Sequence, residues 1–275
     1  MPIADEALLT RYYASQGVAR TAGRIALAYF RDYGRLAVER KGPQDVVSVA
    51  DREVERAIRR KLAQLFPQDA LLGEEGGRVG PADARFLWVV DPIDGTQPFL
   101  AGIPAWCVSI AALDRGVPML GVIYDPNADE LFCACAGLGA LVDGVPAIAS
   151  TATSLSTGMV GVGYSTRTPP APCLAFLEAL LTAGGMFVRN GSGALMIAYA
   201  ATGRLLGYFE AHINAWDCLA GLVLARETGC WTNDFLADEG LARGNLIAIA
   251  SPGVTDEFRS IITATGALTK KRLCT

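Results

Sequence analysis

The sequence contains a single histidine, His212, among 275 residues. A metal site built from several imidazoles is therefore excluded, and a Ser-His-Asp mechanism would depend entirely on this side chain. No Gly-Lys dipeptide occurs, which excludes a Walker phosphate-binding loop. Gly161-Val162-Gly163 lacks the third glycine of the dinucleotide-binding fingerprint, and no ribose-binding acid follows at suitable spacing. Carboxylate chemistry is favoured, and we expect His212 to be a surface or hydrogen-bonded residue.

Charged residues are also few, at 19% of the chain, with a formal net charge of −4. This balance argues against a general nucleic-acid-binding protein, and the basic run Lys270-Lys271-Arg272 is short and terminal. Long apolar runs are missing, because Arg, Asp, Gly or Pro interrupts each stretch before it reaches the length of a membrane helix. Residues 1–10 lack the pattern of a signal peptide. We therefore expect a cytoplasmic protein with no nucleic-acid or membrane partner.

The seven cysteines are an odd number, and Cys133-x-Cys135 has no second pair at zinc-ribbon spacing. In the cytoplasm their thiols would be reduced, so we expect all seven to be small core residues. The hydrophobic content of 51% allows this length of chain to bury a large core. One large or two closely packed α/β units are predicted.

Helical and strand patterns alternate in the first half of the chain. Apolar residues spaced at helical intervals from about Glu6 to Phe30 predict a helix that ends near Gly34. A second helix is predicted to begin at Ser48-Val49-Ala50-Asp51 and to continue until Pro67. Asp114-Arg115-Gly116 and Asp143-Gly144 predict hairpin turns and hence antiparallel sheet. The strands expected in this half lie at residues 86–90, 108–113, 117–124 and 131–134.

From about Ser154 strands and helices alternate more regularly. We expect an α/β fold with an α+β first half, residues 1–150, and an α/β second half, residues 151–275, packed as one body. The helices expected in the second half lie at residues 173–183, 194–201, 216–227, with Gly229 as a stop, and 254–264. The strands expected there lie at residues 187–189, 205–209 and 246–250.

The most informative motif is Asp91-Pro92-Ile93-Asp94-Gly95-Thr96, which follows the apolar run at residues 86–90. It places two carboxylates three residues apart at a predicted turn from strand to helix, where carboxylate oxygens bind hard cations such as Mg²⁺. Gly95 and Thr96 would leave backbone N–H groups free at the helix start, where phosphate binds. The alternative is an Asx turn around Pro92 and Gly95, because turns use the same residue types.

Three further acidic residues lie at the ends of predicted elements. Each has a structural explanation of its own: Glu74 as a solvated loop charge, Asp217 as a favourable charge at a helix N-terminus, and Asp51 as a helix cap. Together with Asp91 and Asp94 they supply enough oxygen ligands for two or three Mg²⁺ ions, with water and substrate phosphate as the remaining ligands. The joint pattern favours a metal site over these separate explanations.

Five motifs occur in the order typical of one known family. They are Asp45-Val46-Val47-Ser48-Val49-Ala50-Asp51, Gly73-Glu74-Glu75, Asp91-Pro92-Ile93-Asp94-Gly95-Thr96, Gly191-Ser192-Gly193, and Trp216-Asp217 seven residues after Glu210. On these motifs the chain resembles the inositol monophosphatase family of Mg²⁺-dependent, lithium-sensitive phosphatases over nearly its whole length. The resemblance implies a layered αβαβα sandwich of the sugar-phosphatase type. It places most metal ligands in residues 1–150, and it places Asp217 and the substrate pocket in residues 151–275.

The resemblance also assigns roles to individual residues, beginning with the metal ligands. Glu74, Asp91 and the Ile93 carbonyl would hold the first metal, and Asp91 would bridge to a second metal held with Asp94 and Asp217. Asp51 and Thr96 match the pair that orients and deprotonates the attacking water, and Glu74 would contribute to catalysis through the first metal. The phosphate would bind the amides of Gly95 and Thr96. The residues implied to face the substrate are Asp94, Gly193, Glu210 and Asp217.

The implied reaction is Mg²⁺-dependent hydrolysis of a small phosphate monoester by direct in-line attack of metal-activated water, without a phosphoenzyme. Three departures from the common family pattern concern the substrate: Ser48 replaces Thr, Gln97-Pro98 replaces Thr-Asn, and Asn214 replaces His. The segment from Gln97 to Trp106 is similar to the histidinol-phosphate phosphatase branch. Glu210 and Asn214-Ala215-Trp216-Asp217 are closer to the inositol-phosphate branch, so inositol 1-phosphate is the favoured substrate.

Two further expectations concern partners and the class of function. The resemblance alone implies a homodimer, since no sequence feature identifies an interface. A catalytically weak regulatory binding protein on the same fold is the alternative of a different class, and another sugar or nucleotide phosphatase is the alternative within the superfamily. The complete acidic set argues for an enzyme, because every carboxylate that the family uses is present.

Overall fold

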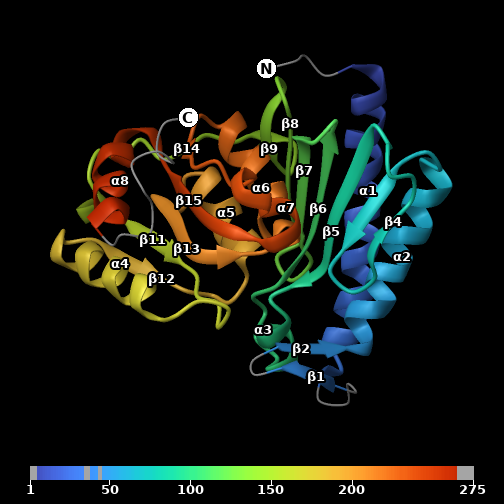
Figure 1. Cartoon of the computed structure of the whole chain (residues 1–275), viewed down its shortest axis with the longest axis horizontal. Helices are drawn as coiled ribbons and strands as arrows, with labels where there is room; N and C mark the ends of the chain where they lie inside the picture. The colour runs from blue at the N-terminus through green and yellow to red at the C-terminus, as the bar shows by residue number, and fades with distance from the viewer. Residues whose placement is uncertain (1–4, 34–37, 43–44, 265–275) are drawn as a thin grey trace.

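The computed structural model describes residues 5–33, 38–42 and 45–264, with the backbone alone for 38–42 and 45–47. The helices are α1 (Glu6–Phe30), α2 (Val49–Leu65), α3 (Thr96–Leu100), α4 (Ala171–Thr182), α5 (Gly193–Ala201), α6 (Ala215–Glu227), α7 (Gly240–Arg243) and α8 (Thr255–Ala264). Five layers are visible in Figure 1: α1 and α2, a first sheet, α5 and α6, a second sheet, and α4 and α8. This arrangement confirms the predicted αβαβα sandwich.

The first sheet has eight strands in the order β10-β9-β8-β7-β6-β5-β3-β4. Their bounds are β3 (Ala70–Gly73), β4 (Gly77–Val79), β5 (Phe86–Asp94), β6 (Cys107–Asp114), β7 (Val117–Asp125), β8 (Glu130–Cys135), β9 (Gly139–Val142) and β10 (Val145–Pro146). Only β3 and β5 pair in parallel, and the other neighbours are antiparallel. The predicted antiparallel first half is therefore correct. A separate antiparallel pair is formed by β1 (Val38–Gly42) and β2 (Asp45–Ser48).

The second sheet has five strands in the order β12-β11-β13-β15-β14. Their bounds are β11 (Met159–Val162), β12 (Met186–Val188), β13 (Gly207–Ile213), β14 (Trp231–Thr232) and β15 (Asn245–Ala250). β11 pairs in parallel with β12 and β13, whereas β15 pairs antiparallel with β13 and β14. The strand expected over 205–209 is displaced: it begins at Gly207 and continues through Glu210 to Ile213.

Local sequence signals explain where the first two helices begin. The Asp5 carboxylate caps α1 by accepting the Leu8 N–H at 2.9 Å. Ser48 caps α2 and forms a capping box with Asp51, as the sequence predicted. α1 ends at Phe30, while Gly34, its expected end, lies outside the described residues. The hairpin turns are also confirmed, because Arg115, Gly116, Asp143 and Gly144 all have the positive φ of a type I′ turn.

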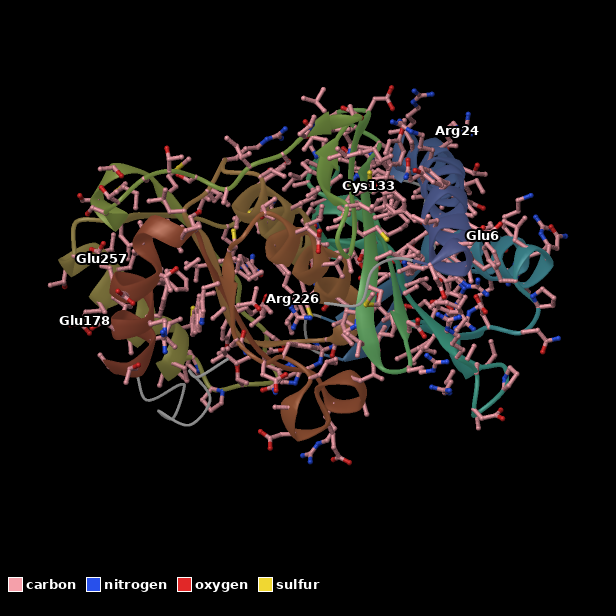
Figure 2. The ribbon with its side chains drawn as sticks, turned by 90° about the horizontal axis from the view of Figure 1, so that it is seen from above. Glu6, Arg24, Cys133, Glu178, Arg226 and Glu257 are labelled. Carbon is pink, nitrogen blue, oxygen red and sulfur yellow. The ribbon has the colours of Figure 1, made fainter. Side chains whose placement is uncertain are left out.

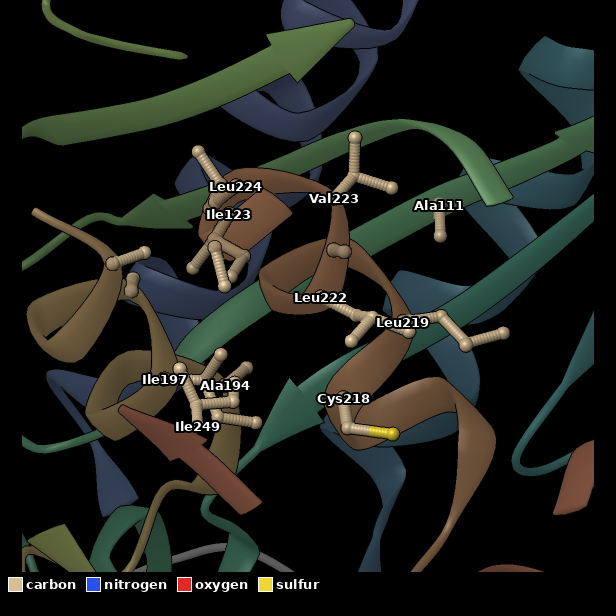
Figure 3. Close-up of a cluster of buried hydrophobic side chains, with 14 of the residues drawn as sticks. Ala111, Ile123, Ala194, Ile197, Cys218, Leu219, Leu222, Val223, Leu224 and Ile249 are labelled. Carbon is tan, nitrogen blue, oxygen red and sulfur yellow. The ribbon is translucent and has the colours of Figure 1, made fainter. Parts of the chain in front are cut away.

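Three apolar clusters hold the five layers together. One joins α1 and α2 to the first sheet, and another joins the second sheet to α4 and α8. The remaining cluster lies between the two sheets around α5 and α6, and Figure 3 shows Ile197 of α5 and Leu222 of α6 within it. α6 is buried on nearly all sides, which is typical of a central helix. Because this cluster draws on both halves, the predicted packing as one body agrees with the apolar core.

The domain boundary near residue 150 falls between the two sheets, which use residues 70–146 and 159–250. The division into two domains stays a prediction. Figure 2 shows the same layers from above, with Glu178 and Glu257 on the outer helices at one side and Cys133 near α1 on the other. The six cysteines within the described residues are all buried with free thiols, as expected for core residues. Cys274 and the run Lys270-Lys271-Arg272 lie outside the described residues.

Among the described residues, no helix combines the length and the apolar character that crossing a membrane requires. The longest helix, α1, has 25 residues but carries polar side chains along one face.

Candidate functional site

β5 extends beyond the expected end at Val90 and carries both acidic residues of the hexapeptide at its end. Its pairing with β6 is interrupted by a bulge between Asp91 and Asp94. Pro92 lies in this bulge, where a residue without an N–H group does not weaken the ladder. The Ile93 N–H donates to Asp91 Oδ1 at 2.9 Å, so a local Asx-type contact exists as well. The two interpretations of the hexapeptide, an Asx turn and a metal site, are therefore compatible with the same backbone conformation.

The structure brings Asp217 to the two carboxylates of β5. Asp91, Asp94 and Asp217 each offer a carboxylate oxygen, and these three atoms lie within 4.8 Å of one another. Asp217 is the third residue of α6, and its Oδ2 accepts the Asn214 N–H at 3.2 Å in a second capping box. The start of α6 thus fixes the distant member of the trio.

Glu74 follows β3, the strand that runs parallel to β5. Its N–H donates to the Val90 carbonyl at 3.4 Å, which places it beside Asp91. Glu74 lines the same cavity as the trio, although it is not one of the residues whose oxygens lie within 4.8 Å. Its negative charge still acts on Asp91.

The electrostatics of these carboxylates favour a bound cation. Burial raises the pKa of Asp91 well above its ordinary value, and the negative charges of Glu74, Asp217 and Asp94 add to the effect. Burial, with the charge of Asp217, raises the pKa of Asp94 to about 7. Desolvation also raises the pKa of Asp217, although a hydrogen bond with Asp91 opposes the shift. A divalent cation would replace the protons that these groups otherwise need.

α5 begins directly beside Asp94 and holds one of its oxygens. Asp94 Oδ2 accepts hydrogen bonds from the Ser192 hydroxyl and from the Ala194 N–H, the latter at 2.7 Å. The backbone of Gly193, at the start of α5, also acts to lower the pKa of Asp94, against the larger effect of burial. One oxygen is thereby fixed at the positive end of a helix, and the other stays available as a ligand.

Thr96 connects the cavity to Asp51 at the start of α2. Its hydroxyl lies 3.3 Å from Asp51 Oδ1 and 3.2 Å from the Ile93 carbonyl oxygen. The other oxygen of Asp51 accepts the Ser48 N–H at 2.8 Å and the Ser48 hydroxyl at 2.6 Å. Burial raises the pKa of Asp51. The capping role and the contact with Thr96 are therefore both present, one on each oxygen.

Gly95 occupies a backbone conformation that a side chain would not tolerate. Its φ is +99°, and an added Cβ would lie 2.7 Å from the Ala105 carbonyl oxygen. It caps α3, so its own N–H and that of Thr96 lie at a helix start without intrahelical acceptors. Pro98 is accommodated in the first turn of this short helix, as expected.

Glu210 lies on β13 at the other side of the cavity. Its Oε2 accepts the Tyr208 hydroxyl at 2.6 Å. Burial raises the pKa of Glu210 to about 8, and the negative charges of Asp217 and Asp94 contribute. Tyr208 was not predicted to have a role. Its position two residues before Glu210, on the same face of the strand, is the signal that could have indicated it.

The cavity that joins these residues has a volume of about 1110 Å³. Every predicted site residue except Asp51 lines it, and Asp51 is buried behind Thr96. His212 does not line it, and its Nε2 lies 3.0 Å from the Arg243 carbonyl oxygen, as expected of a hydrogen-bonded histidine. Arg167 and Arg189 also line the cavity, where their charges act on Asp217 and Glu210, and they were not predicted, because no spacing rule connects them to the acidic motifs.

The sequence matches a model of the inositol monophosphatase family over residues 8–269. The chain belongs to the inositol monophosphatase family. It is a phosphoric monoester hydrolase that binds metal, and the family is Mg²⁺-dependent. Within the part of the chain that the structure describes, Asp91, Asp94 and Asp217 are a group of carboxylates whose spacing could hold a metal ion.

Individual relatives agree with this membership of the inositol monophosphatase family. The Nus factor SuhB of Xylella fastidiosa is 39% identical over 79% of both chains, and the inositol-1-monophosphatase of Mycobacterium leprae is 37% identical over 88% of both. The crystal structure of the extragenic suppressor protein suhB from Bartonella henselae matches with a TM-score of 0.86 and 31% identity, covering 92% of this chain and 98% of that one. The structure of the inositol monophosphatase from Anabaena (Nostoc) matches with a TM-score of 0.81 and 32% identity, covering 94% of this chain and 97% of that one.

Proposed function

We propose that this protein hydrolyses a small phosphate monoester, with inositol 1-phosphate as the favoured substrate, at two or three Mg²⁺ ions in the acidic cavity. The observation that carries the proposal is the convergence of Asp91, Asp94 and Asp217 within 4.8 Å. Among the described residues, none of these three carboxylates forms an ion pair with a lysine or arginine, and the positive charge of Arg167 acts on Asp217 without such a contact. Oxygen ligands at a buried site are what Mg²⁺ prefers.

The proposed ligand sets are those that the resemblance to the family implies. Glu74, Asp91 and the Ile93 carbonyl would hold one ion, and Asp91, Asp94 and Asp217 would hold a second. Bound Mg²⁺ neutralises phosphoryl oxygens, stabilises the leaving alkoxide and lowers the pKa of water toward neutrality. The backbone N–H groups of Gly95 and Thr96 would orient the phosphate at the start of α3.

The chain itself supplies a path for the proton of the attacking water. When the Thr96 hydroxyl donates to Asp51, its oxygen is free to accept a hydrogen bond from water in the cavity. As the water oxygen bonds to phosphorus, its proton passes to the Thr96 oxygen and the hydroxyl proton passes to Asp51. The bond from phosphorus to the alcohol oxygen breaks on the opposite side, the departing alkoxide takes a proton from solvent water, and no phosphoenzyme forms.

The alcohol part of the substrate would contact Glu210, Gly193, Asp94 and Asp217, which form one side of the cavity. Glu210 is held by Tyr208, so its free oxygen has a fixed direction in which to accept a hydroxyl group of a polyol. This feature supports an inositol phosphate, and one relative is named inositol-1-monophosphatase. Histidinol phosphate is the alternative, since the ammonium group of that substrate would also suit Glu210.

The test is a phosphate-release panel that compares inositol 1-phosphate, histidinol phosphate, fructose 1,6-bisphosphate and 3′-phosphoadenosine 5′-phosphate. Each substrate is assayed with Mg²⁺ and after chelation. We expect release only with Mg²⁺ and the highest kcat/KM for inositol 1-phosphate. A preference for histidinol phosphate would change the substrate and leave the mechanism in place. Release that continues after complete chelation would contradict the mechanism.

A second candidate function is a regulatory binding role on the same fold. It is favoured by one observation, namely that a relative with 39% identity is named a Nus factor. Absence of phosphate release from every substrate of the panel, in a folded protein that binds Mg²⁺, would support this candidate. Two further predictions stay predictions: the homodimer and the cytoplasmic location.

Replacing Thr96 with valine tests the proton path. Valine fills nearly the same volume, and the Ser48–Asp51 capping box does not use the hydroxyl, so the fold should persist. We expect kcat to fall about 10²-fold, the usual contribution of a positioned acid-base group. Thr96→Ser, which keeps the hydroxyl, is the matched control and should retain most of the activity. A wild-type kcat for Thr96→Val would contradict the path through Thr96 and Asp51.

A further inference from the structure

Glu55 is a buried carboxylate on α2 for which the proposed mechanism has no use. Only 2% of its surface is exposed. Its Oε1 accepts the Gly76 N–H at 2.8 Å and the Arg59 Nε–H at 2.6 Å, and its Oε2 accepts the Glu75 N–H at 2.8 Å. Two backbone amides of the segment that contains Glu74 therefore donate to one side chain of another element.

The segment from Gly73 to Gly77 is fitted closely around the Glu55–Arg59 pair. Arg59 Nη2 donates to the Gly77 carbonyl at 2.6 Å, so the pair holds the segment at a third point. A Cβ at Gly73 would lie 2.6 Å from the carboxyl carbon of Glu55, and a Cβ at Gly76 would lie 2.9 Å from its Oε1. Side chains at these positions would displace the pair, so glycine permits the close approach.

Glu74 lies between these anchored positions. On its N-terminal side Gly73 belongs to β3, and the Glu74 N–H donates to Val90 of β5. On its C-terminal side the next two amides donate to Glu55. The backbone on both sides of Glu74 is thus fixed, which limits where its side chain can lie in the cavity, where its charge acts on Asp91.

We propose that Glu55 is a positioning residue that holds Glu74 in place as a ligand of the first Mg²⁺ ion. This inference rests on the proposed function of the cavity. Glu55 acts through the amides of Glu75 and Gly76 rather than through contact with the metal. Because a buried carboxylate that accepts charge-assisted hydrogen bonds is strongly directional, it can fix the loop without covering the cavity.

α2 would then set two parts of the site at once. Asp51 and Glu55 are four residues apart and both buried, so they lie on one face of the same helix. Asp51 accepts the Thr96 hydroxyl, while Glu55 holds the segment of Glu74. The helix therefore fixes the position of Asp51, which would take the proton of the attacking water, relative to Glu74, which would bind the Mg²⁺ ion that holds this water.

The experiment compares Glu55→Gln with Glu53→Gln in the full-length protein. Glutamine has the same shape but presents an NH₂ group to one of the loop amides and loses the charge that pairs with Arg59. Glu53 is on the same helix, and its partly exposed carboxylate pairs only with Arg56 in the described contacts. Two quantities are measured: the Mg²⁺ concentration for half-maximal phosphate release, and hydrogen exchange of the Glu75 and Gly76 amides without Mg²⁺.

For Glu55→Gln we expect the Mg²⁺ requirement to rise at least about 10-fold, while kcat at saturating Mg²⁺ stays within a few-fold of wild type. The two loop amides should exchange faster in the metal-free protein. Glu53→Gln should change neither quantity. A role limited to stability would lower kcat at saturating Mg²⁺ and leave the requirement for the ion unchanged.

An unchanged Mg²⁺ requirement in Glu55→Gln would overturn this inference alone, provided that wild-type protein shows Mg²⁺-dependent phosphate release. A wild-type protein without such release would overturn the proposed function and the inference with it. If Glu55→Gln does not fold, Arg59→Lys replaces it, because lysine keeps the charge and loses the geometry of the bond to Gly77. It should shift the Mg²⁺ requirement in the same direction.

Discussion

Replacing Asp94 with asparagine is expected to reduce phosphate release by at least about 10³-fold, or about 4 kcal/mol in the activation free energy. The amide oxygen of asparagine can still accept the hydrogen bonds from Ser192 and Ala194, so the start of α5 should keep its place. The NH₂ group would then occupy the position of the free carboxylate oxygen. It offers no lone pair to a cation, so the proposed second Mg²⁺ ion would lose a ligand.

Activity and thermal stability together check this prediction. Mg²⁺ should raise the Tm of the wild-type protein, because an ion that binds only the folded state stabilises it. The Asp94→Asn variant should have a normal circular dichroism spectrum and a smaller Mg²⁺-dependent rise in Tm. Glu178→Gln, an exposed acidic position on α4, is the control and should behave as wild type. A variant at position 94 with wild-type turnover would contradict the ligand assignment.

Gly121→Ala is expected to lower both the stability and the activity, although residue 121 does not line the cavity. An added Cβ would lie 2.2 Å from the Ala220 carbonyl oxygen and 2.8 Å from the Ala220 Cα, so the backbone of α6 must move away from β7. Overpacking of this kind costs about 3 kcal/mol. Since α6 carries Asp217, a displacement of about 1 Å should reduce kcat/KM by about 10²-fold.

Gly17→Ala is the matched control for this glycine. Gly17 lies within α1, is exposed, and has open space where the Cβ would be placed. Alanine should stabilise the helix there by about 0.5–1 kcal/mol. We expect a fall in Tm of about 6 °C or more for Gly121→Ala, against no change or a small rise for Gly17→Ala. Equal Tm values for the two variants would show that α6 adapts to the added methyl group.

The long periodic elements could be predicted from the sequence because their apolar spacing is sustained. α1 begins at Glu6 as predicted, and the capping box at Ser48 correctly indicated the start of α2. Several short strands were not predicted, among them β9, β11 and β14, because their two to four residues are too few for a period to show. The end of β5 was placed too early because Pro92 resembles a break, whereas a bulge accommodates it.

Within the site, the acidic residues could be predicted because each belongs to a short local motif. The contacts that these residues make with distant parts of the chain could not be predicted. Nothing in the spacing of Asp94 and Ser192 indicates that the serine hydroxyl holds this carboxylate. No role was predicted for Glu55, because in the sequence it is one of the polar residues between the apolar positions Val54 and Ile58 of an amphipathic helix. Its distance of one helical turn from Asp51 was the available signal. Such partners depend on tertiary packing that a linear pattern does not contain.

Because α5 and α6 lie between two sheets, the cavity has one part where the sequence can hardly be altered and another part where it can. Most residues of both helices are buried, so the acidic wall at their starts has little outer surface where an insertion could be accommodated. Residues 163–167 and 189–191 also line the cavity; they lie in loops at its rim, where Arg167 and Arg189 are exposed. Engineering a new alcohol preference should therefore begin at this rim, where loop length and charge can be altered while the hydrolytic centre is left intact.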